Sequence, residues 1–437
     1  MGVSQSTVLK IRATILKEGE SAVNDPETAA KDPEIAVKGP ETAVKDPKRS
    51  VKDPESAVRD LEASGLSDID QDVSETAEDD LPLASTKYEK WRSQYVRPWK
   101  DMLYIDYNKR KEVKEEGAVT CSEAIGYGML ISVLMRNQKD FDGLNRWFLK
   151  FKNKRGLVAW QQVKYHSSYR NNPEGGDDSA TDGDIDVATA LLYAGHVWGK
   201  SADGKQDYRQ LGIDLCKAIW EHDFNHKTYM PLLGDWSEED KKYLLVTRPS
   251  DFILSAFVTF KAEDTERSEQ WGKVLEATIS TMQRQLKKYP NGLISDFMKG
   301  DSKGKFSPVT KEVLESENDK NYNWNSCRVP WRLAAYYLLT QDERVKPIMV
   351  AQAKFFTSKK EIKAGYKLNG KAISDRDYGD KAYTAPVALE LWALKDKRLG
   401  KVLKQLKELE SDKSYYGDSI QMLCLLQARD PRGYETK

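Results

Sequence analysis

The sequence contains little cysteine and little histidine: each occurs only four times in 437 residues. The four cysteines are Cys121, Cys216, Cys327 and Cys424, and they show none of the paired spacings that zinc sites use. Three of them fall in apolar helical stretches, which predicts buried thiols. A disulfide between Cys121 and Cys327 stays open as an alternative. The cysteines therefore suggest no metal centre.

The histidines give one pattern to weigh, because His222 and His226 lie four residues apart. On a helix this spacing places two imidazoles on one face, where they can bind zinc. Asn225 and the turn-forming residues around it predict that the helix ends here, which spoils that geometry. We therefore expect no metal and no other cofactor.

Net charge is also missing, because 69 lysines and arginines balance 69 aspartates and glutamates. A balanced chain has no overall field to attract nucleic acid. No apolar run is long enough to cross a bilayer, and no secretory hydrophobic segment opens the sequence. We expect a monomer that binds no nucleic acid and has no membrane span.

Aromatic side chains are absent before Tyr88, and the composition of this first part differs from the rest. A seven-residue unit built on Asp-Pro-Glu recurs, with variations, between Asp25 and Val58. A heptad is typical of a coiled coil, but the proline in every unit interrupts a helix. We therefore expect a disordered arm over residues 1–82 and one folded domain over residues 83–437.

Helical periodicity dominates the expected domain, where loops rich in glycine, aspartate, asparagine and proline separate the apolar stretches. The pattern predicts twelve helices, at residues 86–98, 122–137, 139–152, 183–199, 205–221, 250–262, 267–287, 326–340, 343–358, 384–396, 398–409 and 414–428. Twelve consecutive helices pair into six helical hairpins. The fold class predicted from periodicity is therefore all-α.

The most informative stretch places three acids, Asp182, Asp184 and Asp186, at the start of an apolar helix. Capping and the helix dipole favour one such acid, but three so close together exceed what a cap needs. Another apolar helix begins with a lone acid, Glu123, near Tyr127. Packing among apolar neighbours raises the pKa of a carboxyl, as a general acid near neutral pH requires. Glu123 is therefore a candidate general acid.

Both helix starts belong to a series of motifs that keep a fixed order along the chain. The segments are Ser122–Met129, Gly156–Trp160, Ala180–Trp198, Leu233–Trp236, Thr247–Asp251, Gly292–Phe297, Asn325–Arg332 and Gly365–Gly370. Together they resemble glycoside hydrolase family 8, over about Lys87 to Leu426. The resemblance implies inverting hydrolysis of a β-1,4-linked polysaccharide on an (α/α)6 barrel of six helical hairpins.

The resemblance also implies roles for single residues. Glu123 matches the general acid, and Asp182 matches the acid that holds the sugar at the cleaved bond. In the cellulase-like branch an aspartate base precedes the Arg-Val-Pro-Trp-Arg segment, but this chain has Asn325 there. The chain is similar instead to the branch of chitosanases and lichenan-cleaving enzymes, whose base is a glutamate on an inserted loop. Glu315 is the match for that base, and Glu317 is the alternative.

Substrate contacts are expected from aromatic rings, which stack on the apolar faces of sugars, and from polar side chains near the motifs. The candidates are Tyr127, Trp160, Trp236, Arg248, Asp251, Tyr322, Trp324, Asn325 and Arg328. Trp331 begins an apolar helix and is expected in the core. Arg248 and Asp251 fit an internal ion pair equally well, and that alternative stays open.

The resemblance therefore implies an endo-acting, inverting hydrolase of β-1,4 bonds, a reaction that uses two carboxyls about 6.5–9.5 Å apart. The acids within residues 177–186, with Glu315, Glu317 and Asp319, favour a cationic polymer, so chitosan is placed ahead of lichenan and cellulose. A non-catalytic polysaccharide-binding barrel is the rival if no loop glutamate reaches the water site. Polymer degradation suggests a secreted protein, although no signal segment opens the chain.

Overall fold

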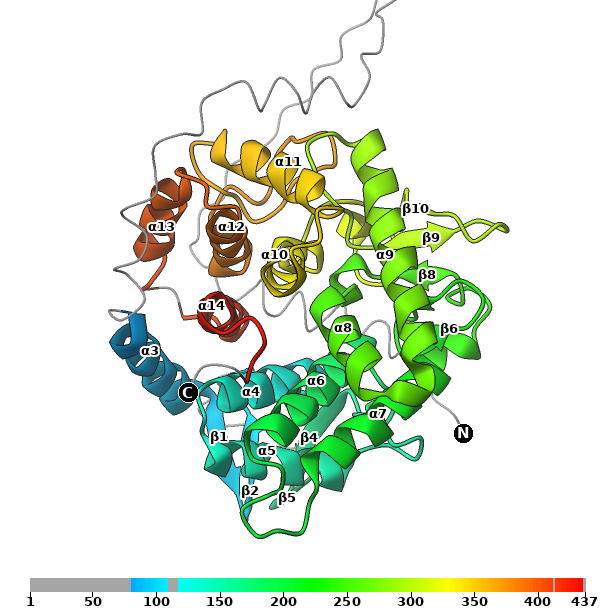
Figure 1. Cartoon of the computed structure of the whole chain (residues 1–437), viewed down its shortest axis with the longest axis vertical. Coiled ribbons are helices and arrows are strands. Elements are labelled where there is room, and N and C mark those ends of the chain that lie inside the picture. Colours follow the sequence, from blue (N-terminus) through cyan, green and yellow to red (C-terminus); the bar gives the residue numbers. More distant parts are fainter. Residues whose placement is uncertain (1–79, 109–116, 412, 435–437) are drawn as a thin grey trace, which may run out of the picture. The chain divides into compact units, whose positions relative to one another are not determined.

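The computed structural model describes residues 80–108, 117–411 and 413–434 (Figure 1). The expected arm, residues 1–82, lies almost wholly outside the described residues, so its interpretation stays a prediction. The described residues belong to the helical domain, whose first described helix begins at Asp80.

The described residues contain twelve α-helices, arranged as an inner ring and an outer ring (Figure 1). The inner ring consists of α4 (Ser122–Leu134), α6 (Thr181–Val197), α8 (Leu254–Glu263), α10 (Val329–Thr340), α12 (Lys381–Ala393) and α14 (Tyr415–Arg429). The outer ring consists of α3 (Asp80–Tyr95), α5 (Gln138–Phe151), α7 (Tyr208–Asp223), α9 (Ser268–Lys288), α11 (Lys346–Thr357) and α13 (Leu399–Glu408). Each outer helix precedes an inner one, so the predicted (α/α)6 barrel of six hairpins is confirmed.

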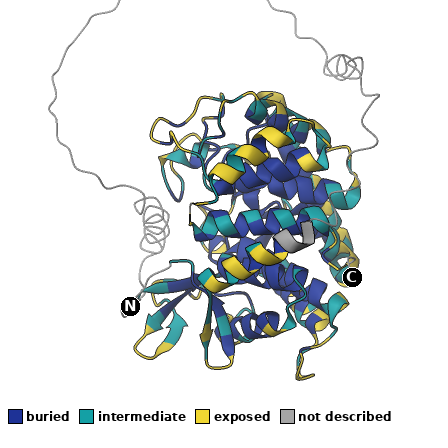
Figure 2. Cartoon of the chain, turned by 90° about the vertical axis from the view of Figure 1, so that its left-hand side faces the viewer, coloured by how far each residue is buried: buried dark blue, intermediate teal, exposed yellow. Residues whose placement is uncertain are grey.

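Burial distinguishes the two rings. Inner helices pack on several sides, and α4 is apolar around most of its circumference: it buries every residue from Ala124 to Leu134. The outer helix α13 buries only Val402. Figure 2 shows this contrast, with dark blue helices inside and yellow surfaces on the outer helices. None of the helices in the described part of the chain is both long enough and apolar enough to cross a membrane.

The first described helix ends earlier than its sequence pattern predicts. α3 stops at Tyr95, whereas the expected helix runs to residue 98. The segment Val96–Trp99 forms strand β1 instead, which pairs antiparallel with β2 (Met102–Ile105). Pro98 within this segment has no amide hydrogen for a helical hydrogen bond. The strand pairing therefore determines this boundary.

The described loops contain three further small antiparallel sheets. One sheet has the strand order β3 (Ala118–Cys121), β4 (Gln161–Tyr165) and β5 (Ser168–Asn171). A second has the order β10 (Phe306–Pro308), β9 (Met298–Gly300) and β8 (Val246–Thr247). The third pairs β6 (Phe224–Asn225) with β7 (Met230–Pro231). Strand β3 leads directly into α4, so this sheet fixes where that helix begins.

A small second core lies beneath the loop that carries Glu315. Its buried members are Leu233, Trp236, Tyr243, Val246, Phe297, Val309 and Leu314. Leu314 directly precedes Glu315, so the burial of this leucine anchors the backbone at the predicted base. Trp236, a predicted sugar-stacking residue, packs edge-on against Tyr243 in this core, with ring centroids 5.1 Å apart.

All four cysteines are free thiols. Cys216, Cys327 and Cys424 are buried, as the apolar surroundings of three cysteines predict, and Cys121 is half-buried. The Sγ atom of Cys327 donates to the carbonyl oxygen of Trp324 at 3.1 Å. The open alternative of a disulfide between Cys121 and Cys327 is therefore not realised in this structure.

Two glycines allow α4 and α6 to approach each other closely. A Cβ atom on Gly183 of α6 would lie 2.4 Å from the Ser122 Oγ and 2.7 Å from the Ser122 carbonyl carbon. A Cβ atom on Gly126 of α4 would lie 2.9 Å from the Cβ of Asp186. The starts of the two helices are therefore in direct contact, and only glycine permits this spacing.

We expect Gly183→Ala to reduce activity strongly and stability moderately. The added methyl meets the backbone of Ser122, which cannot rotate aside, so the two helix starts must separate. Overpacking of this kind costs about 1–3 kcal/mol, whereas a misplacement of about 1 Å costs about 10²-fold in rate. Thermal unfolding and kcat/KM measured on one preparation test this. The control is Gly272→Ala, where the only near neighbour is the end of Lys261; a fully active Gly183→Ala enzyme would contradict the argument.

Candidate active site

Glu123 lies in the first turn of α4, directly after strand β3. Its side chain is 20% exposed, whereas those of Asp182 and Glu315 are 6% and 7% exposed. One carboxyl oxygen accepts a hydrogen bond from Arg328 at 3.1 Å, and the other accepts one from the Tyr415 hydroxyl at 3.3 Å. Glu123 is therefore the most accessible of the three predicted catalytic carboxyls, and two donors orient it.

Arg328, just before α10, connects the parts of the site. Its Nη1 atom donates to the Oδ2 of Asp182 at 2.8 Å as well as to Glu123. Its Nη2 atom donates to the Oγ of Ser250 at 2.9 Å and to the Oδ1 of Asn325 at 3.1 Å. A buried guanidinium needs such partners, because an unpaired buried charge is costly. The starts of α4 and α6 are therefore tied to the segment that enters α10.

Glu315 lies on the loop that precedes the short helix η4 (Glu317–Lys320). Its Oε1 atom accepts a hydrogen bond from Arg248 at 3.1 Å, and its Oε2 atom accepts one from the Nδ2 of Asn325 at 2.7 Å. Each of the two carboxyl oxygens therefore has a donor. Glu317 is exposed on η4. Of the two candidate bases, Glu315 is thus the one that contacts Asn325.

Asp319 holds the backbone of this loop. Its carboxylate accepts hydrogen bonds of 2.8–3.2 Å from four consecutive amides, those of Val313, Leu314, Glu315 and Ser316. Ser316 and Asp319 also form a capping box at the start of η4. The backbone at Glu315 is therefore preformed, and the Asp319 carboxylate is occupied by the loop itself.

Burial raises the pKa of Glu123 to about 7, with Arg328 opposing the rise and Asp182 adding to it. Burial also raises the pKa of Asp251 to about 7, against the effect of Arg248. A group with a pKa near the working pH exchanges protons readily in both directions, which suits general acid catalysis. The electrostatics of Glu123 therefore match the role that the sequence predicts for it.

The sequence pattern reveals no role for Asp296, although this residue organises the side of the site around Asn325. It accepts hydrogen bonds from the amide and the hydroxyl of Ser326 at 2.7 and 2.6 Å. It also accepts one from the Asn325 amide at 3.3 Å. Burial raises the pKa of Asp296 to about 7, and the Ser326 hydrogen bonds oppose the rise. The sequence feature that could have indicated this role is an acid inside the otherwise apolar motif Leu-Ile-Ser-Asp-Phe.

Tyr415 is a second contributor that sequence reasoning missed. It begins α14 and lies 292 positions after Glu123, to which it donates. Its ring packs edge-on against Tyr95 and Tyr107, with centroids 5.9 and 6.1 Å apart. No local pattern signals this contact, because closure of the barrel brings α14 beside α4.

Most of the predicted sugar-stacking aromatics are covered by other side chains. Tyr127 and Tyr322 are fully buried, and Trp160 and Trp236 are only 6% and 8% exposed. Their rings therefore offer no free face to a sugar in this structure. The reason is that the inner helices and loop cores pack against aromatic rings, which are large contributors to cores. Trp324 is the half-buried member of the predicted set.

The neighbouring rings explain two of these positions. Tyr127 packs edge-on against Trp331, with centroids 5.8 Å apart, and its hydroxyl accepts a hydrogen bond from Arg328 at 3.4 Å. Trp331 is fully buried, so its predicted place in the core is confirmed. Trp324 packs against Tyr383, with centroids 5.1 Å apart. Tyr127 therefore contacts Arg328, the residue that binds Glu123 and Asp182.

Arg248 and Asp251 form internal contacts and are 3% and 0% exposed. The Nη1 atom of Arg248 lies 3.9 Å from a carboxyl oxygen of Asp251 and 3.9 Å from one of Asp182. These contacts fit the internal ion pair that the sequence left open, and the sugar-ligand alternative stays a prediction. The side chains of Arg328 and Asn325 likewise form hydrogen bonds with neighbouring side chains, and these two residues are 1% and 7% exposed.

Only one of the three acids at the start of α6, Asp182, touches Arg328. Asp184 is fully buried and accepts the Val158 amide at 2.6 Å. Asp186 accepts two hydrogen bonds from Arg332, at 3.2 and 2.8 Å. Two acids that favoured a cationic substrate are therefore engaged inside the protein, which weakens the argument for chitosan.

The histidine pair does not share a helix face. α7 ends at Asp223, as the turn-forming residues predict, and His226 lies beyond it. The His226 ring stacks on Trp220, with centroids 4.6 Å apart, and hydrogen-bonds to the Trp220 carbonyl at 2.7 Å. Within the described ranges, no group of three or more His, Cys, Asp or Glu side chains is arranged to hold a metal ion.

Comparison with known proteins gives consistent matches. The β-glucanase of Niallia circulans is 33% identical over 357 residues, which is 78% of this chain and 82% of that protein. Endoglucanase A of Acetivibrio thermocellus is 30% identical over 318 residues, which is 70% of this chain and 61% of that protein. The apo structure of a β-1,3-1,4-glucanase from Paenibacillus sp. X4 has a TM-score of 0.73 and 30% identity, over 86% of this chain and 97% of that one.

A family model described as glycosyl hydrolases family 8 matches residues 78–430. The matched region contains the complete barrel from α3 to α14, with both acid-bearing helix starts and the loop of Glu315. Fold, motif order and sequence identity therefore agree. The chain belongs to glycosyl hydrolases family 8 and is a glycoside hydrolase.

Proposed function

We propose that this glycoside hydrolase is an endo-acting, inverting β-glucanase that cleaves β-1,4 bonds in mixed-linkage glucans such as lichenan. The observation that carries the proposal is the contact between Asn325 and the buried carboxylate of Glu315, at 2.7 Å. Asn325 stands where the cellulase-like branch has its base, so a different carboxylate must activate water. A preformed loop that presents Glu315 there supports the lichenan-cleaving branch.

In the proposed reaction, Glu123 gives its proton to the leaving glycosidic oxygen while Glu315 takes a proton from the attacking water. The water attacks the anomeric carbon opposite the leaving group, so the new reducing end has inverted configuration. Burial raises the pKa of Glu123 and favours its protonated form, Asp182 adds to the rise, and Arg328 holds both side chains in place. Arg248 and Asn325 orient Glu315 by donating to its two oxygens.

The choice of glucan over chitosan rests on two supports. Two of the similar proteins are a β-glucanase and a β-1,3-1,4-glucanase by name, and a third is an endoglucanase. In addition, Asp184, Asp186 and Asp319 are engaged in internal hydrogen bonds, so they are not available to bind amines. The rival of a non-catalytic barrel required that no loop glutamate reach the water site, and the contact between Glu315 and Asn325 supports the catalytic alternative.

Reducing-sugar release from lichenan, carboxymethyl cellulose and soluble chitosan, measured in parallel, tests the substrate. We expect lichenan to be cleaved at least about 10-fold faster than the other two, because a factor of ten requires only about 1.4 kcal/mol of preferential transition-state binding. NMR of fresh product should show the α-anomer first. Faster cleavage of chitosan would move the proposal to that polymer, and an initial β-anomer would contradict the inverting mechanism.

The pH profile should report the protonation of Glu123. Because the acid must be protonated, kcat/KM should fall about tenfold per pH unit above its pKa of about 7. The Tyr415 hydroxyl donates to the ionised form and lowers this pKa, so Tyr415→Phe should move the alkaline limb to higher pH. Tyr416→Phe is the matched control, because that hydroxyl donates to the Trp324 carbonyl. An unshifted limb in Tyr415→Phe would exclude Glu123 as the titrating acid.

A further inference from the structure

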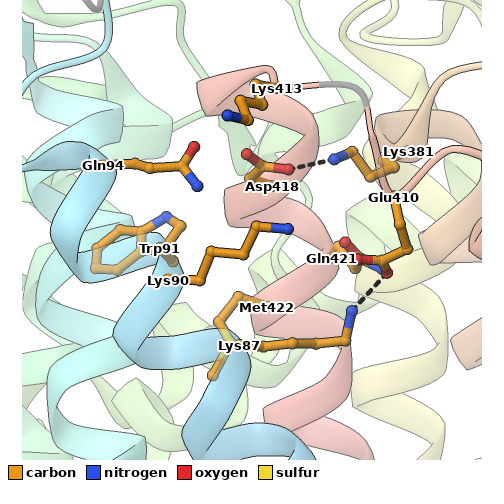
Figure 3. Close-up of a pocket in the computed structure, with 10 residues that line it drawn as sticks. All are labelled: Lys87, Lys90, Trp91, Gln94, Lys381, Glu410, Lys413, Asp418, Gln421 and Met422. Atoms are coloured by element: carbon orange, nitrogen blue, oxygen red, sulfur yellow. Dashed lines mark hydrogen bonds and ion pairs between the residues drawn. The ribbon is translucent and has the colours of Figure 1, made fainter.

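A hollow between α3 and α14, also bordered by the start of α12, is separate in its lining residues from the catalytic site (Figure 3). It is open to solvent, and the space not filled by atoms is about 410 Å³ when the solvent at its mouth is included. We call it the α3–α14 hollow. It lies where the first described helix of the barrel meets the last one.

Four lysines but only two acids line the α3–α14 hollow. Lys87 pairs with Glu410 at 2.5 Å, and Lys381, whose side chain is 3% exposed, pairs with Asp418. Glu410 also accepts a hydrogen bond from the side-chain amide of Gln421 at 2.8 Å, and Asp418 accepts one from the hydroxyl of Tyr95 at 2.5 Å. One lysine therefore neutralises each acid, and two positive charges remain.

The two remaining charges belong to Lys90 on α3 and Lys413 before α14. Both are exposed, and neither has an ion-pair partner among the residues that the structure describes. Figure 3 shows them on different sides of the same space. Ammonium groups placed around one hollow attract an oxyanion, and lysine is a common ligand of phosphate. The two lysines therefore favour an anionic ligand with several oxygens.

Gln94 adds a second requirement for the ligand of the hollow, namely a hydrogen-bond donor. It lies on the same face of α3 as Lys87 and Lys90 and lines the same hollow. Its Oε1 atom is buried and accepts no hydrogen bond within the described ranges. A buried acceptor without a donor costs free energy, so an occupant that offers an O–H group is favoured. A matching ligand combines negatively charged oxygens with at least one hydroxyl.

We propose that the α3–α14 hollow binds a small oxyanion that also carries a hydroxyl. Hydrogen phosphate has this chemistry, and so does a hydroxy-carboxylate such as a sugar acid. Lys90 and Lys413 bind the charged oxygens, and Gln94 accepts from the hydroxyl. The bound anion links the helix that opens the described barrel to the segment that enters its last helix. It therefore stabilises barrel closure without taking part in catalysis.

Thermal unfolding of the full chain tests the site in chloride, sulfate, phosphate and glucuronate at equal ionic strength. At a concentration about ten times Kd, we expect phosphate or glucuronate to raise Tm by about 2 °C beyond its effect on a Lys90→Gln/Lys413→Gln variant. Sulfate, which has no hydroxyl at neutral pH, should show a smaller difference. The comparison is made between variants, because sulfate and phosphate stabilise proteins in general. Comparison of the Tm shifts in phosphate and in glucuronate shows which of the two, phosphate or a sugar acid, is the better ligand.

The matched control is Lys354→Gln/Lys404→Gln, which removes two exposed charges from α11 and α13, outside the hollow. It should keep the full anion effect, and lichenan cleavage should be unchanged in both double variants. Gln94→Leu should abolish the preference for phosphate over sulfate. Equal Tm shifts in the wild type and in Lys90→Gln/Lys413→Gln would overturn the proposal, whatever the enzyme's activity on glucans.

Discussion

Replacing Glu123 by glutamine lowers the cleavage rate of lichenan by about 10²- to 10⁴-fold, the range typical for loss of a general acid. Glutamine keeps the shape of the side chain and an oxygen that accepts from Arg328, so substrate binding should change little. Its amide cannot give a proton to the leaving oxygen. The loss should therefore appear in kcat, with KM nearly unchanged.

An activated substrate separates this role from a structural one. A dinitrophenyl glycoside releases a phenolate that needs no protonation, so Glu123→Gln should cleave it nearly as fast as the wild type. The variant should also bind cellooligosaccharides with wild-type affinity in calorimetry. An equally large loss of cleavage rate on both kinds of substrate would show that the variant disturbs the site. It would contradict the role of Glu123 as the general acid.

Replacing Glu315 by glutamine should also cost about 10²- to 10⁴-fold, but on both kinds of substrate. The attacking water needs a base whatever the leaving group is, so an activated leaving group does not help. Glutamine can still contact Arg248 and Asn325, which limits structural damage at this buried position. Rates on lichenan and on a dinitrophenyl glycoside, measured for both variants, distinguish the acid from the base.

Glu317→Gln is the matched control for the base, because it makes the same change two residues away on an exposed side chain. We expect its kcat/KM to stay within about twofold of the wild type, as for a surface substitution of at most about 0.5 kcal/mol. If Glu317→Gln loses activity and Glu315→Gln does not, the loop must rearrange when substrate binds, and Glu317 becomes the base.

The amino-acid sequence determines the helical architecture because helix signals are local. Apolar periodicity and turn residues act within a few positions of each other, and all twelve expected stretches overlap a helix. Several helix ends differ from the expected bounds by a few residues. Residues 96–98 form a strand instead of a helix because they pair with β2, a contact that periodicity does not include. The same local reasoning located Glu123 and Asp182 at helix starts, since acids are favoured there by capping and by the helix dipole.

The tertiary structure alone decides what those acids contact. Arg328 meets Glu123 across 205 positions, and Tyr415 meets it across 292. Closure of the barrel creates these contacts, and no local pattern encodes them. Burial is equally non-local: Tyr127 and Arg328 look like substrate ligands in the motifs, but the surrounding helices cover them. The sequence by itself determined the helices, the family resemblance and the acid-bearing segments, whereas packing across the barrel determined which carboxyls stay accessible, because accessibility depends on neighbours far away in the chain.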